Sequence, residues 1–139
     1  MSATGLGGSQ RAALARLADV LVAEGRGMPA ASAVDVAGEL IDRCLEAAPV
    51  LAEPLGALLD ELASEAPEVF ARQLAAHRPD DFAVLSTAVV GAYYLSPEVR
   101  GLIGYPGQEP SPLSVATEPD YLDMLERVHE RHPGYREAP

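Results

Sequence analysis

The 139-residue chain contains no lysine, no asparagine and no tryptophan, and it has one cysteine. The joint absence of lysine and asparagine indicates the codon bias of a GC-rich genome. Ten arginines stand against 21 acidic residues, which gives a net charge of -11. A chain this acidic is repelled by phosphate backbones and by anionic lipid surfaces, so nucleic-acid binding and peripheral membrane binding are excluded as functions.

The single thiol and the N-terminal region exclude further classes. Cys44 cannot form an intrachain disulfide, and its place in an apolar helical pattern is typical of a buried small side chain. Arg11, Arg16 and Asp19 interrupt the first apolar segment, so neither a signal peptide nor a membrane span is visible there. We therefore expect a cytoplasmic protein.

Apolar residues recur at helical spacing along most of the chain, and no strand-like alternation is seen. Alanine and leucine, both strong helix formers, dominate the apolar residues. Ser9 is expected to cap a first helix that ends near Gly25, and Ser32 a second helix over residues 33–48. The second helix should carry an acidic stripe on one side, formed by Asp35, Glu39, Asp42 and Glu46.

Prolines are expected to open several later helices, because a proline fits the first helical turn. Pro67, Pro79 and Pro97 each precede a new apolar pattern. The segment from Pro79 to about Leu95 is apolar on nearly all sides, which predicts a helix at the centre of the domain. A last helix is expected over residues 118–131.

From Ile103 onward the composition changes to proline-rich sequence, and Tyr105-Pro106-Gly107-Gln108 carries the pattern of a type II turn. We predict an all-α fold: a small irregular helical bundle of about six or seven helices with an extended Pro-rich C-terminal arm. Residues 1–8 should form a disordered N-terminus and residues 9–102 the bundle. Residues 103–139 should form the arm plus terminal helix, within the same domain.

One pattern could hold a metal. Glu126 and His129 form a Glu-x-x-His step, with His132 one turn further on. A carboxylate-bridged bundle needs two such steps and two further glutamates, whereas the chain has one step. A solvated helix end is therefore favoured, and we assign no metal ligand, no catalytic residue and no cofactor-binding residue in this chain; the metal bundle stays an alternative.

All five tyrosines fall in the last third of the chain. Tyrosine is enriched at protein interfaces because it buries a large area and keeps a polar tip. On the residues alone, this region could equally bind a partner or wrap its own bundle. The candidate partner-binding residues are Tyr93, Tyr94, Ile103, Tyr105, Pro106, Tyr121 and Tyr135.

Residues 93–100 (YYLSPEVR) and 103–108 (IGYPGQ) resemble the C-terminal signature of the gluconate 2-dehydrogenase small-subunit family, also called its third subunit. The tail is similar at Tyr121, Leu122, Val128, Glu130, Arg131, Pro133, Tyr135 and Arg136.

The resemblance implies a non-catalytic accessory subunit that binds and stabilises a large FAD-containing oxidoreductase subunit of the glucose–methanol–choline class. FAD would then sit in that partner, which oxidises alcohols or sugars. Periplasmic members carry a twin-arginine signal, which is not seen here, so a cytoplasmic complex is expected. A free-standing acidic helical adaptor or a homo-oligomer is the competing hypothesis.

Overall fold

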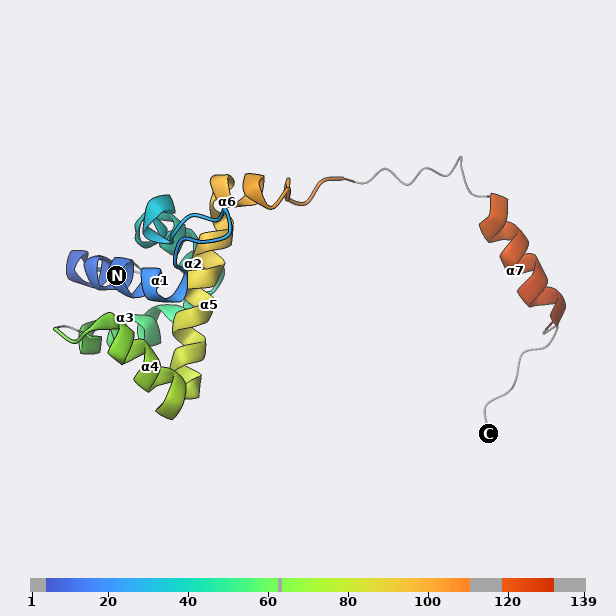
Figure 1. The fold of residues 1–139 in the computed structure, drawn as a ribbon. Coiled ribbons are helices and arrows are strands. Elements are labelled where there is room, and N and C mark those ends of the chain that lie inside the picture. The colour runs from blue at the N-terminus through green and yellow to red at the C-terminus, as the bar shows by residue number, and fades with distance from the viewer. Residues whose placement is uncertain (1–4, 63, 111–118, 132–139) are drawn as a thin grey trace, which may run out of the picture. The chain divides into compact units, whose positions relative to one another are not determined.

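The computed structural model describes residues 5–62, 64–110 and 119–131, with side chains from Leu122 onward in the last range. In these ranges the chain forms seven α-helices, a few short helical turns and no strand (Figure 1), which confirms the predicted all-α fold. Internal contacts divide it into two units, Met1–Gly107 and Gln108–Pro139. The first unit holds α1 (Gly8–Leu21), α2 (Ile41–Ala47), α3 (Ala52–Leu62), α4 (Pro67–His77), α5 (Pro79–Leu95) and α6 (Pro97–Leu102).

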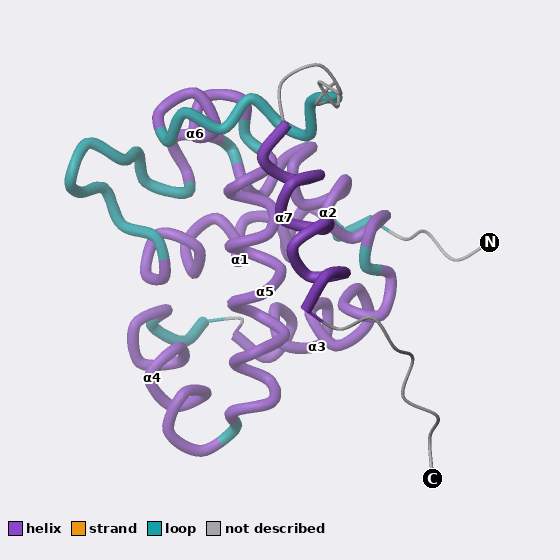
Figure 2. Tube along the Cα trace, turned by 90° about the vertical axis from the view of Figure 1, so that its right-hand side faces the viewer, coloured by secondary structure: helices purple, strands orange, loops and turns teal. Residues whose placement is uncertain are grey.

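Helix α5 runs through the middle of the first unit, as Figures 1 and 2 show. Helices α1 to α4 and α6 all contact it. These contacts bury most of its apolar residues and confirm its predicted central place, while Ala83, Thr87, Val90 and Tyr94 form one exposed side. Its buried residues are Leu85, Ala88, Val89, Ala92 and Tyr93.

Three helices of the first unit begin at the predicted prolines. Pro67, Pro79 and Pro97 occupy the first turns of α4, α5 and α6, where the missing backbone N–H costs nothing. The single residue between α4 and α5, Arg78, leaves helical geometry, and its side chain pairs with Glu61 and with Asp81 of α5, each at 2.6 Å. Local sequence therefore determines these boundaries.

The N-terminal prediction is wrong over residues 5–8, which the structure describes. Leu6 is buried in the core, so the chain packs against the bundle before α1 begins. Helix α1 starts at Gly8 and not after Ser9, because the Gln10 side chain accepts a hydrogen bond from the Gly7 N–H at 2.9 Å. A reciprocal glutamine at the third position replaces the serine cap that the sequence suggested.

The predicted second helix, residues 33–48, is broken. A single 3₁₀ turn (Ser32–Val34) and a wide turn (Val36–Leu40) precede the shorter α2. Asp35 adopts the left-handed conformation, with φ of 55°, and the backbone leaves helical angles again at Gly38. The predicted acidic stripe therefore does not run along one continuous helix.

The physical reason for the break lies in α1. The Arg11 guanidinium donates hydrogen bonds to the Ala37 and Gly38 carbonyls at 2.9 and 3.0 Å and to both Asp42 carboxylate oxygens at 2.7 and 2.9 Å. It also donates to the Leu6 carbonyl at 3.1 Å. Arg11 thus satisfies carbonyls that a continuous helix would have used, across about 30 residues of sequence.

The second unit contains α7 (Pro119–Arg131), which lies where a last helix was predicted. Among its residues whose side chains are described, four apolar ones are exposed: Leu122, Met124, Leu125 and Val128. No helix in the described ranges combines the length and the apolar character needed to cross a membrane.

Candidate functional site

The YYLSPEVR segment forms the junction between α5 and α6. The Ser96 hydroxyl caps α6 by accepting a hydrogen bond from the Val99 N–H at 3.4 Å, and Pro97 takes the first helical position. Val99 is fully buried and fixes the short helix to the core. A serine, a proline and one apolar residue thereby set the angle at which the chain leaves α5.

The following IGYPGQ segment ends α6 with two glycines of positive φ. The Gly104 N–H bonds to the Gly101 carbonyl at 3.2 Å and the Tyr105 N–H to the Arg100 carbonyl at 2.9 Å, which is a Schellman motif. Its left-handed position, Gly104, has φ of 69°. Gly107 has φ of 100°, as a type II turn requires of the residue after its proline.

Four side chains at this junction remain 47–54% exposed: Tyr94, Leu102, Ile103 and Tyr105. We call these four residues the tyrosine corner. Arg100 supports it from beneath, because its Nε donates to the Tyr94 carbonyl at 2.9 Å and its guanidinium carbon lies 5.9 Å from the Tyr105 ring centroid. The corner is therefore an apolar and aromatic surface on a backbone with fixed geometry.

Of the predicted partner-binding residues, Tyr93 faces inward. It is 3% exposed, so its ring is unavailable to a partner in this structure. Its hydroxyl donates to the Pro29 carbonyl at 2.7 Å, and its ring meets that of Tyr94 edge-on at 5.5 Å. Burial, and then the charges of Tyr94 and Glu98, raise the pKa of Tyr93 above its ordinary value.

The other predicted residues divide between the units. Tyr94, Ile103, Tyr105 and Pro106 lie together at or beside the tyrosine corner, and all four are exposed. Tyr121 belongs to α7 in the second unit, where only its backbone is described, and Tyr135 lies outside the described residues.

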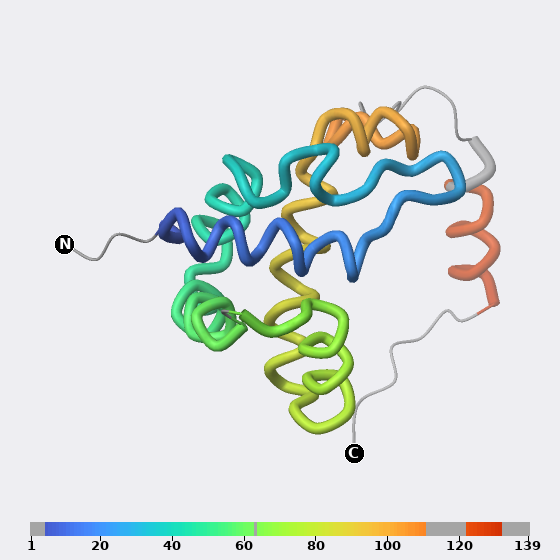
Figure 3. Tube along the Cα trace, turned by 60° about the vertical axis from the view of Figure 1, so that its left-hand side comes forward, coloured from blue at the N-terminus to red at the C-terminus, as the bar shows by residue number. Residues whose placement is uncertain are grey.

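A groove of about 440 Å³ adjoins the corner, and sequence reasoning did not anticipate it. One wall is the loop that follows α1, seen beside α6 in Figure 3. Gly25 and Met28 pair there by hydrogen bonds of 3.1 and 2.9 Å around a two-residue turn. Leu102 lines the groove as well as the corner, and the charged residues of its lining are Glu24, Glu98 and Arg26. No sequence signal indicated that the loop after α1 lies beside α6. The two are brought together by contacts between distant segments, such as the hydrogen bond from the Tyr93 hydroxyl to a carbonyl 64 residues earlier.

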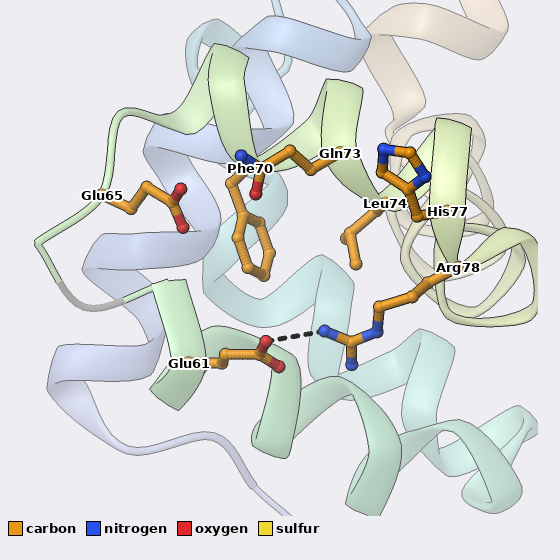
Figure 4. Close-up of a pocket in the computed structure, with 7 residues that line it drawn as sticks. All are labelled: Glu61, Glu65, Phe70, Gln73, Leu74, His77 and Arg78. Carbon is orange, nitrogen blue, oxygen red and sulfur yellow. Dashed lines mark hydrogen bonds and ion pairs between the residues drawn. The ribbon is translucent and has the colours of Figure 1, made fainter.

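A second cavity, of about 220 Å³, lies where α3 meets α4 (Figure 4). Phe70 and Leu74 provide its apolar lining, with Glu65, Gln73 and His77 around it. The Glu61–Arg78 ion pair closes one side. These side chains can hold a small polar molecule, but they include no serine, threonine or cysteine nucleophile.

The metal alternative finds two of its three residues in described parts of the chain. Glu126 and His129 are exposed on α7, one turn apart, and His132 lies outside the described residues. Within the described ranges, no three or more His, Cys, Asp or Glu side chains gather closely enough to hold a metal ion.

The cysteine is buried as expected. The Cys44 thiol lies 3.6 Å from the Ala88 carbonyl oxygen, and burial raises its pKa. A raised pKa lowers the thiolate fraction at neutral pH, so this thiol is suited to packing and not to nucleophilic chemistry.

Comparison with known proteins returned no relative: no family model, no curated protein and no solved structure matches the chain. The exposed residues of the tyrosine corner are therefore the basis for a functional proposal.

Proposed function

We propose that the chain is a non-catalytic accessory subunit that binds a large FAD-containing oxidoreductase subunit of the glucose–methanol–choline class. The observation that carries the proposal is the tyrosine corner. Three of its four exposed side chains, those of Tyr94, Ile103 and Tyr105, come from the two segments that resemble the gluconate 2-dehydrogenase small-subunit signature. FAD and the groups that act on an alcohol or sugar would belong to the partner.

The corner has the composition of a protein-binding surface. Two tyrosines and two aliphatic residues offer apolar area with polar hydroxyl groups, a combination enriched at the centres of interfaces. In many interfaces a few side chains, often aromatic ones, supply most of the binding free energy.

The corner is also preorganised for binding. The Ser96 cap, the left-handed Gly104 and the Arg100 contacts fix the backbone that carries the exposed side chains. Little conformational entropy is then lost on association, which strengthens binding for a given contact area.

The charge of the chain favours a different protein as partner over a second copy. Two copies, each with a net charge of -11, repel one another, whereas a partner with basic residues around its binding surface is attracted. The groove beside the corner is lined by Glu24 and Glu98 against one cation, Arg26.

Co-expression tests the proposal. The chain is produced with the flavin-containing oxidoreductase encoded by the adjacent gene, and complexes are purified through a tag on the chain. We expect a stable yellow complex with a flavin absorption spectrum. Absence of such a gene, or purification of the chain alone, overturns the proposal.

A matched pair of variants tests the surface. Ile103→Arg places a charge in the tyrosine corner and is expected to weaken the complex at least about 100-fold, because an unpaired buried charge costs several kcal/mol. Val50→Arg makes the same change at a residue that is 81% exposed elsewhere on the bundle, and should leave the affinity unchanged. Equal effects of the two variants would reject the corner as the binding surface.

A further inference from the structure

The cavity where α3 meets α4 lies at the opposite end of α5 from the tyrosine corner. Arg78 lines the cavity and directly precedes α5, whereas the corner begins at Tyr94, beside the last residue of that helix. Helix α5 has 17 residues, so at 1.5 Å per residue its two ends lie about 25 Å apart. What the cavity binds is therefore a separate question from the proposed function.

The floor of this cavity is apolar and held in place. Phe70 and Leu74 lie one turn apart on α4 and are 3% and 1% exposed, so packing against the core fixes both side chains. Figure 4 shows the Phe70 ring between the Glu65 and Leu74 side chains. The cavity of about 220 Å³ is larger than the roughly 150 Å³ of an engineered protein cavity that takes up benzene. An apolar group of about the size of one ring therefore fits on this floor.

The charges around the floor select the sign of a ligand. The Arg78 guanidinium pairs with Glu61 in the cavity and with Asp81 beyond it, each at 2.6 Å, so its positive charge is already matched. Among the described residues, the Glu65 carboxylate has no hydrogen-bond or ion-pair partner. His77 is counted as neutral at pH 7. An anionic ligand is repelled by the unmatched carboxylate, whereas a cationic one is attracted to it.

We propose that this cavity binds a small organic monocation, an ammonium group attached to an apolar body of about one ring. The body would rest on Phe70 and Leu74, and the ammonium group would donate to the Glu65 carboxylate. The side-chain carbonyl of Gln73, also in the lining, offers a second acceptor. Ammonium groups are also attracted to aromatic rings, which favours a position beside Phe70.

Three probes of nearly equal size separate charge from shape. Benzylammonium, benzyl alcohol and benzoate each carry one benzene ring and one further carbon, and they are cationic, neutral and anionic at pH 7. Each is titrated into the full-length chain, and the backbone amide signals of α4 are followed by NMR. We expect benzylammonium to bind with a dissociation constant on the order of 1 mM. Benzyl alcohol should bind at least about three-fold more weakly, and benzoate should give no saturable shift.

A matched pair of variants locates the binding carboxylate. Glu65→Arg replaces attraction by repulsion and is expected to weaken benzylammonium binding about ten-fold. Glu46→Arg makes the same change of charge at an exposed position of α2 outside the cavity lining, and should alter the affinity less than two-fold. Circular dichroism checks that both variants keep the helix content of the unaltered chain.

Three results would overturn the inference. Equal affinities of the unaltered chain for benzylammonium and benzyl alcohol would show that the cavity does not select a cation. Equal effects of the two variants would mean that the net charge of -11 attracts the probe without a defined site. Shifts that leave α4 unchanged would place binding elsewhere. Because the chain is tested without a partner, none of these results decides whether it binds the flavin-containing subunit.

Discussion

Helices α5 and α7 contain similar apolar residues but use them differently. In α5, Leu85 and Val89 are fully buried between neighbouring helices. In α7, Leu122 and Leu125 are half exposed or more. Burial of the apolar residues of α5 stabilises the fold, whereas the described apolar side chains of α7 contribute little such free energy in this structure. The contrast separates a helix that maintains the bundle from one that does not.

The same substitution in the two helices should give the largest difference. Leu85→Ala removes a fully buried side chain and is expected to lower the free energy of unfolding by about 3 kcal/mol, through lost burial and a residual cavity. Leu125→Ala should change it by no more than about 0.5 kcal/mol. Urea denaturation followed by circular dichroism measures both, and comparable losses would contradict the division between α5 and α7.

The network around Arg11 gives the next largest effect within the bundle. Arg11→Met removes the donor to three backbone carbonyls and to Asp42, and should lower the free energy of unfolding by about 2 kcal/mol. Arg43→Met is the control, because Arg43 is exposed on α2, and its effect should stay within about 0.5 kcal/mol. If Arg11→Met is as mild as the control in urea unfolding, Arg11 does not hold the broken segment together.

Two glycines at the tyrosine corner should respond with opposite signs. Gly104→Ala forces a side chain into the left-handed region and should destabilise the chain by about 1 kcal/mol. Gly101→Ala lies in α6 with open space around the added methyl group, and should stabilise it by about 0.5 kcal/mol. Melting temperatures that move in the same direction for both variants would refute the Schellman geometry.

Alkaline pH should lower the stability of the bundle and should not affect α7. The pKa values of Cys44 and Tyr93 are raised in the folded chain from 9.0 and 10.0, so the unfolded chain releases these protons first. Stability is therefore complete below pH 9 and falls as pH rises through 9 and then 10. The chain has no lysine to titrate in this range. Tyr93→Phe should remove the later part of the decline, and a decline that the variant leaves unaltered would assign it to other groups.

Helix positions were predictable wherever the signal is local. The starts of α4, α5 and α6 follow from prolines. These features depend on backbone chemistry within one turn of the residue concerned.

The break at Asp35 was not predictable from the sequence, because its cause is distant. Residues 33–48 have a helical apolar pattern in which Gly38 is the one local signal of a break, and the hydrogen bonds from Arg11 to the Ala37 and Gly38 carbonyls come from another helix. A pattern read along one segment contains no information about a donor elsewhere in the chain.

The residue types at the site were predictable, but the direction in which each side chain points was not. Three predicted residues are exposed and belong to the tyrosine corner, Tyr94, Ile103 and Tyr105, and their part in binding stays a prediction. The inward position of Tyr93 was missed because α5 is apolar on nearly all sides, so the spacing of apolar residues indicates its buried side only weakly. The adjacent groove was missed because it is built by a loop some 70 residues earlier in the chain.

The single cysteine allows opening of the bundle to be measured. Its sulfur is enclosed between α2 and α5, so a thiol-specific reagent can reach it only when these two helices separate. The rate of labelling in native buffer then reports how often the domain opens. No other thiol in the sequence competes for the reagent. An associated subunit that stabilises the bundle would lower the rate of Cys44 labelling. The decrease would measure this stabilisation without any tag or dye on either protein.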